Sequence, residues 1–151
     1  ILLAVQFGVY VADDIPTYQN RLARAQDNEE IAFYGQAMEA LGPLVEQPLK
    51  VYFDYRLYVP EREGWTLETT YDLLSYNYVA EADYEVLLLL NQRIADYINP
   101  ATSGIDSQQY INSLKFYNDA NRGTLQGYRL VLRNETGSVF IKDELAQEIV
   151  D

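Results

Sequence analysis

Five consecutive apolar residues, Val86 to Leu90, limit the possible folds of this chain more than any other feature of its sequence. The acidic stretch 81–83 precedes this run, and the polar stretch 91–93 follows it. A short, wholly apolar run is typical of a strand buried on both faces, because a half-exposed strand would alternate with polar residues. Periodicity alone would also allow a helix, but the polar flanks favour the strand. We therefore predict a short strand, buried on both faces, at about 85–90.

Two further regions have strand character. Residues 49–55 are β-branched and aromatic and lie between Pro48 and Pro60. Near the end of the chain, 127–133 and 138–141 flank the four-residue loop 134–137, which closes on Gly137. Two apolar runs joined by such a short loop predict a β-hairpin. Its Asn134-Glu135-Thr136 triplet also matches a glycosylation sequon, but we interpret it first as a turn.

Helical patterns separate these strands. The spacing of apolar residues predicts helices within 13–45, at about 67–76 with Thr66 as N-cap, at 92–97 and at 106–121, and a helical tail after Lys142. Alternation of helix and strand predicts a parallel sheet with right-handed crossovers. The expected fold class is α/β: a small three-layer-like single domain over 1–151, with parallel strands, helical crossovers, a helical N-terminal segment at 13–45 and a closing antiparallel hairpin in an α/β core over 49–142.

The residue types that the chain lacks exclude several chemistries. It has no cysteine and no histidine, which removes disulfides, thiolate or histidine metal ligands, Ser-His-Asp triads and Cys-His dyads. With 11 Lys and Arg against 23 Asp and Glu, the net charge is −12. The basic residues are scattered, so nucleic acid is not an expected partner. No motif predicts a cofactor or a metal, and no catalytic residue is nominated.

The first twelve residues, Ile1 to Ala12, are apolar and uncharged. They are too few to span a bilayer, which needs about 20 residues. Two interpretations stay open: a buried strand, or the outer end of a membrane helix that begins before Ile1.

Polar residues mark the ends of two predicted strands. Asp54 and Arg56 come at the end of the first, and Asn91, Gln92 and Arg93 come directly after the apolar run. Ligands of α/β sheets bind beyond the carboxyl ends of the strands. If the two strands are neighbours, these five residues form one rim, where arginines and amides could bind a small polar or anionic ligand.

The chain holds 14 tyrosines, which suit the edge of a core, a protein interface or stacking against a sugar. The stretch from Leu49 to Glu144 also resembles the C-terminal extracytoplasmic soluble domain of multi-spanning membrane glycosyltransferases that use polyprenyl-phosphate sugars. The resembling segments are 50–54, 82–88, 127–131 and 139–142. The resemblance implies that Ile1–Ala12 ends a membrane helix and that the catalytic carboxylates lie outside this chain.

These observations lead to one functional hypothesis with two alternatives. We expect a non-catalytic, extracytoplasmic domain tethered to the membrane as part of a larger, glycosyltransferase-like protein. Its partners would be the rest of that protein, another protein, a carbohydrate or a lipid-linked sugar. The alternatives are a free-standing, cytoplasmic binding protein for a small polar or anionic ligand at the rim, and an acidic protein-interaction module.

Overall fold

A computed structural model gives the fold of the protein and describes residues 29–98 and 107–149. The segment Ile1–Ala12, for which a strand and a membrane-helix end were both considered, lies outside these residues. So does the first part of the helical stretch predicted at 13–45. Within the described part of the chain, no helix combines the length and the apolar character needed to cross a bilayer.

One five-stranded sheet organises the molecule, in the order β2-β1-β3-β5-β4. Three strands are parallel: β1 (Leu49–Phe53), β2 (Trp65–Glu68) and β3 (Val86–Leu90). The hairpin of β4 (Tyr128–Arg133) and β5 (Gly137–Lys142) completes the sheet, with β5 antiparallel to β3. The predicted parallel sheet closed by an antiparallel hairpin is confirmed.

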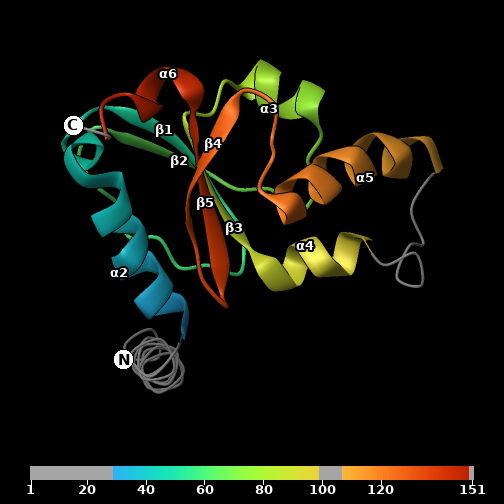
Figure 1. Ribbon diagram of the computed structural model, residues 1–151, viewed down its shortest axis with the longest axis horizontal. Helices are drawn as coiled ribbons and strands as arrows, with labels where there is room; N and C mark the ends of the chain where they lie inside the picture. The colour runs from blue at the N-terminus through green and yellow to red at the C-terminus, as the bar shows by residue number, and fades with distance from the viewer. Residues whose placement is uncertain (1–28, 99–106, 150–151) are drawn as a thin grey trace, which may run out of the picture.

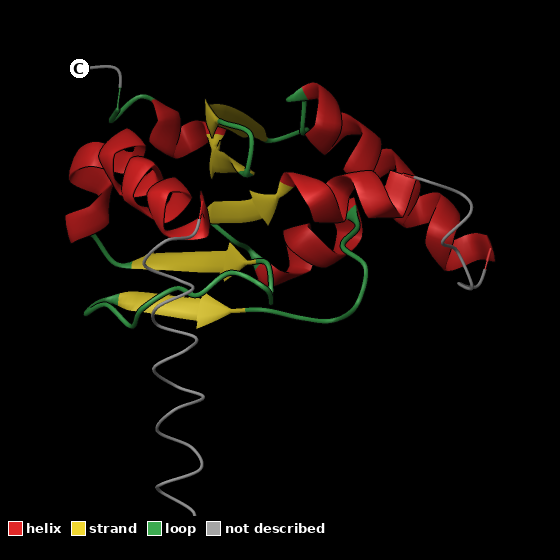
Figure 2. Ribbon diagram, turned by 90° about the horizontal axis from the view of Figure 1, so that it is seen from below, coloured by secondary structure: helices red, strands yellow, loops and turns green. Residues whose placement is uncertain are grey.

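Helices cover both faces of this sheet (Figures 1 and 2). One face carries α2 (Glu29–Leu41), the 3₁₀ helix η1 (Gly42–Glu46) and the short α6 (Asp143–Ala146). The other carries α3 (Tyr76–Ala82), α4 (Asn91–Ile98) and α5 (Ser107–Arg122). The predicted three-layer α/β class is therefore confirmed, as are the helices predicted near 92–97 and 106–121.

The apolar run that dominated the sequence is the central strand β3. All five of its side chains are buried. Val86, Leu88 and Leu90 pack with α2, whereas Leu87 and Leu89 pack with the helices of the opposite face. Alternate side chains of a strand point to opposite faces, so both layers need apolar residues here and the usual polar alternation disappears.

The helix predicted at 67–76 is wrong. Residues 65–68 form the edge strand β2, and the helix α3 begins only at Tyr76, where Ser75 rather than Thr66 is the N-cap and accepts a hydrogen bond from the Tyr78 amide. A strand of four residues is too short to show a clear alternation. The spacing of Leu67, Tyr71 and Leu74 matches one face of a helix, and it therefore led to the prediction of a helix.

Helix α2 packs tightly against the sheet at Gly137. A Cβ atom at this glycine would lie 2.6 Å from the Phe33 ring and 2.8 Å from the carbonyl oxygen of Leu89. The start of β5 therefore requires a residue without a side chain.

Candidate functional site

The carboxyl ends of β1 and β3 are adjacent, as the sequence pattern required for a common rim. Asp54 follows β1, and Arg93 lies in the first turn of α4, directly after β3. Arg93 Nη1 donates to Asp54 Oδ1 over 3.1 Å, and the two side chains are only 4% and 2% exposed. Two of the five predicted rim residues thus form a buried ion pair.

The Arg93 guanidinium makes further contacts around this pair. Its Nε donates to the Tyr97 hydroxyl at 3.2 Å, and its Nη2 donates to the carbonyl oxygens of Thr70 and Asp72 at 3.2 and 3.4 Å. Burial acts to lower the pKa of Arg93, but Asp54 and the nearby tyrosines raise it above its ordinary value, so the group stays charged. Arg93 therefore joins the segment after β2 to the ends of β1 and β3.

Aromatic rings flank the same guanidinium. The Arg93 guanidinium carbon lies 4.5 Å from the centre of the Tyr55 ring and 5.2 Å from that of Tyr97. The Tyr71 ring lies 4.7 Å from the Tyr55 ring and is 80% exposed. We call Tyr55, Arg56 and Tyr71 the tyrosine rim. Its outer ring is open to solvent, while its inner ring rests on a fixed, buried arginine.

The remaining predicted rim residues have separate partners. Arg56 is exposed, donates to the Tyr55 hydroxyl at 3.0 Å and lies 3.8 Å from an Asp96 carboxylate oxygen. Gln92 is exposed and donates to Asp96 at 3.0 Å. Asn91 contacts the β4–β5 turn instead, where it donates to the Asn134 carbonyl and accepts from the Ser138 hydroxyl. Asn91 thus contributes to the packing of the hairpin, and ligand binding by all five residues stays a prediction.

Carboxylates surround the rim. Asp54, Asp72 and Asp96 belong to the segments just described, and Glu30 in the first turn of α2 is electrostatically coupled to Asp54 and Arg56. Burial, together with the charge of Asp54, raises the pKa of Glu30, and Arg56 works against this. Carboxylates lie beside both Arg56 and Arg93 and balance their positive charge. The surface at these strand ends therefore has little excess positive charge with which to bind an anionic ligand.

Sequence analysis did not select several contributors to the rim. Tyr97 follows Arg93 by one helical turn, so the i, i+4 spacing could have indicated the contact. Thr70, Tyr71 and Asp72 could not be assigned to the rim, because they follow β2, the strand that was predicted as a helix.

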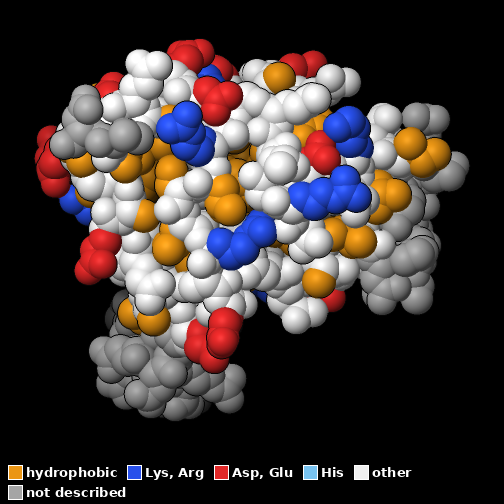
Figure 3. Space-filling view, in the orientation of Figure 1, with side chains coloured by type: hydrophobic (Ala, Val, Ile, Leu, Met, Phe, Trp, Pro, Cys, Tyr) orange, Lys and Arg blue, Asp and Glu red, His pale blue; other side chains and the backbone are white. Residues whose placement is uncertain are grey.

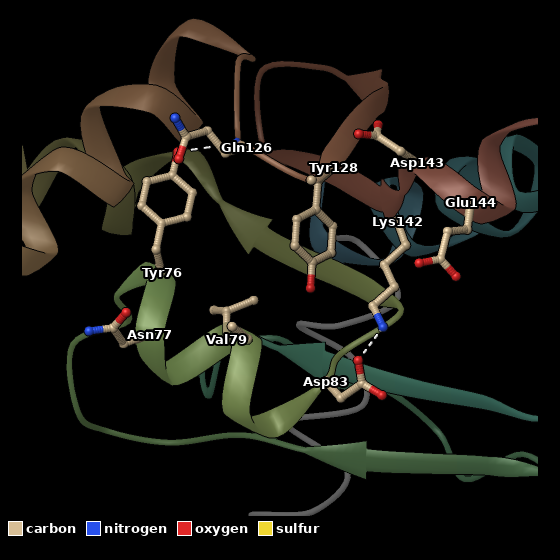
Figure 4. Close-up of a pocket in the computed structure, with 11 residues that line it drawn as sticks. Tyr76, Asn77, Val79, Asp83, Gln126, Tyr128, Lys142, Asp143 and Glu144 are labelled. Carbon is tan, nitrogen blue, oxygen red and sulfur yellow. Dashed lines mark hydrogen bonds and ion pairs between the residues drawn. The ribbon is translucent and has the colours of Figure 1, made fainter.

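A groove of about 630 Å³ lies at the other end of the same sheet (Figure 4). One wall is α3, with Tyr76, Asn77 and Val79. The other wall is formed by the segments that come before β4 and after β5, which contribute Gln126, Gly127, Asp143 and Glu144. The Tyr128 ring stands between the walls, with its hydroxyl donating to the Tyr84 carbonyl at 2.5 Å, and Lys142 pairs with Asp83 across the mouth. No pattern in the sequence indicated this groove.

Among the residues that the structure describes, no three acidic side chains are grouped so that they could hold a metal ion. Comparison with known proteins finds no matching family model, no matching curated protein and no matching solved structure.

Proposed function

We propose that this chain is a non-catalytic, extracytoplasmic domain of a larger membrane protein of the glycosyltransferase type, and that its tyrosine rim contacts the sugar acceptor. One observation carries the proposal. An exposed tyrosine ring, Tyr71, packs at a tilt of 50° against a second tyrosine, Tyr55, whose ring lies beside a buried arginine held by four hydrogen bonds. A fixed, exposed aromatic surface suits the apolar face of a sugar ring.

The arrangement of the polar groups supports binding rather than catalysis. The Arg93 guanidinium and the Asp54 carboxylate bond to each other inside the protein, where they position the tyrosines. The groups left at the surface are Arg56, Gln92 and Asp96, which can exchange hydrogen bonds with sugar hydroxyls. Such groups bind and orient a ligand.

The fold is also compatible with the proposed protein class. The segments 50–54, 82–88, 127–131 and 139–142, on which the resemblance rests, supply most of β1, β3, β4 and β5. These four strands are consecutive neighbours in the sheet. The resemblance therefore concerns one continuous part of the structure.

The sugar-binding proposal can be tested by saturation-transfer NMR with methyl glucoside, methyl mannoside and N-acetylglucosamine as probes. We expect transfer to the ring C–H protons of at least one sugar and a loss of at least about fivefold in Tyr71→Ala. Tyr58→Ala is the matched control, because Tyr58 is 65% exposed and has no described ring partner. Absence of transfer from the wild-type protein, or equal losses in both variants, would contradict the proposal.

The membrane proposal needs a separate measurement on the full-length protein in its own cells. We expect it to sediment with membranes after a carbonate wash and to be cleaved at this domain by a protease added outside the cytoplasm. Recovery in the soluble cytoplasmic fraction would instead support the free-standing binding protein.

A further inference from the structure

The strand β4 forms one edge of the sheet, and its outer side pairs with no strand among residues 29–98 and 107–149. None of its six side chains is fully buried, whereas five of six are buried in the neighbouring β5. The opposite edge, β2, has only four residues. Of the two edges, β4 is therefore the longer one at which an added strand could pair.

The charges around β4 differ from those of the rest of the molecule. The described residues include nine Lys and Arg, and six of them form ion pairs with a carboxylate. The three that form none are Arg122, Arg129 and Arg133. Arg129 and Arg133 belong to β4, and Arg122 ends α5.

Hydrogen bonds place Arg133 beside the end of α5, and Arg129 lies four residues before Arg133 in the same edge strand. Arg133 donates to the carbonyls of Ala120 and Asn121, so the end of α5 lies against the end of β4. Figure 3 shows Lys and Arg side chains across the middle of the face on which β4 lies, with acidic side chains mostly toward its margins. This basic region on a chain of net charge −12 indicates complementarity to an acidic partner.

We propose that β4 binds an extended acidic segment of a partner protein, which adds a sixth strand to the sheet. The partner's backbone would pair with the free amides and carbonyls of β4, and its carboxylates would meet Arg129 and the arginines at the end of the strand. The bulge places Arg129 opposite Ile141 and Arg133 opposite Ser138, so the two arginines point to opposite faces of the sheet. They are roughly 10–13 Å apart along the strand, so a segment of five to seven residues whose two acids also point to opposite faces fits.

A second copy of this chain suits the edge less well. Antiparallel pairing of β4 with its own copy, centred on Arg129 or on Arg133, would place two identical arginines opposite each other, and like charges opposed across a sheet are destabilising. Arginines and a bulge on an edge strand also discourage unwanted pairing. The partner must therefore supply carboxylates that compensate this repulsion.

The experiment is an NMR titration of the ¹⁵N-labelled protein with a blocked peptide, Thr-Glu-Val-Thr-Glu-Val-Thr, whose two glutamates point to opposite faces of an extended strand. We expect saturable shifts of the amides of 128–133. Replacing both glutamates of the peptide by glutamine should weaken binding at least about threefold. A peptide with proline at its central position keeps both charges but cannot extend the sheet, and it should bind at least about tenfold more weakly.

Two matched variants of the protein distinguish binding of the peptide at β4 from a non-specific electrostatic attraction between the peptide and the protein. Arg129→Gln should weaken binding at least about threefold, whereas Arg62→Gln, which removes the same charge near the opposite edge, should leave it within about twofold. Equal binding of the proline peptide, or equal effects of the two variants, would overturn the proposal. A concentration-dependent dimer that the peptide cannot dissociate, seen by analytical ultracentrifugation, would overturn it in favour of a second copy.

Discussion

The side chain of Arg93 connects three parts of the sheet: β3 through its place in the chain, β1 through Asp54, and the segment after β2 through the Thr70 and Asp72 carbonyls. Four hydrogen bonds and a buried carboxylate depend on this one residue. Removing it would leave Asp54 as an uncompensated buried charge, which costs much more than the loss of one surface contact.

We expect Arg93→Ala to lower the free energy of unfolding at pH 7 by about 3–5 kcal/mol, measured by urea denaturation. Arg56→Ala should cost less than about 1 kcal/mol, because its pair with Asp96 is exposed. A loss below about 1 kcal/mol in Arg93→Ala would contradict the structural role. The double variant Asp54→Leu/Arg93→Met removes both charges, and it should lose less stability than Arg93→Ala.

The sequence was informative about the rim where residues follow strands directly. Asp54 and Arg93 could be placed at strand ends because both strands were recognisable, and the structure shows that the two strands are neighbours. Asn91 satisfied the same rule, yet its side chain contacts the hairpin. A strand-end position fixes the place of the backbone, and the neighbouring elements decide where the side chain finds its partners.

At the scale of elements, the contact of α2 with β5 allows a sharp comparison of two glycines. Gly137→Ala would force a methyl group against the Phe33 ring and the Leu89 carbonyl, at a cost of about 1–3 kcal/mol. Gly35→Ala, on the exposed side of α2, meets nothing within 4 Å and should stabilise the helix by about 0.5–1 kcal/mol. Thermal unfolding of both variants checks the prediction, and a stabilised Gly137→Ala would show that α2 is placed differently.

Elements with a strong local pattern could be predicted, and those defined by the rest of the fold could not. The run at β3 and the hairpin carry their own signals in the sequence. The strand β2 does not, because its four residues form a strand only through pairing with β1. Because β2 was predicted as a helix, Tyr71, which follows it, could not be assigned to the candidate site.

At the scale of the whole molecule, burial dominates the behaviour of the tyrosines. It is the main cause that raises the pKa of six of them above the ordinary value near 10; these are Tyr34, Tyr52, Tyr76, Tyr84, Tyr117 and Tyr128. For Tyr76 the pKa rises to about 12, with the hydrogen bond to Asp119 contributing after burial. The folded protein thus keeps phenol protons that the unfolded chain releases near pH 10.

The sign of the resulting pH dependence follows from this difference. Groups with a raised pKa in the folded state contribute their full stabilisation below pH 10, and this contribution is lost as the pH rises toward 12. We expect the urea midpoint to fall steeply above pH 10, together with a cooperative rise of tyrosinate absorbance at 295 nm. Ionisation of these tyrosines without loss of helical circular dichroism would contradict the prediction.

Charge placement also belongs to the whole molecule. The basic residues are scattered in the sequence, and no window of the chain indicates a basic surface. Folding brings Arg122, at the end of a helix, next to Arg133 in a strand. Such a surface depends on tertiary contacts, so composition and net charge alone could not indicate it.

The strand order has a consequence for synthesis on the ribosome. The wholly apolar β3 lies between β1 and β5, and β5 comes almost fifty residues later in the chain. Until residues 137–142 have left the exit tunnel, β3 has a bonded neighbour on one side only. The nascent chain therefore passes through a stage with a long, apolar, unpaired edge, which is the period in which a chaperone that recognises extended apolar segments would bind it.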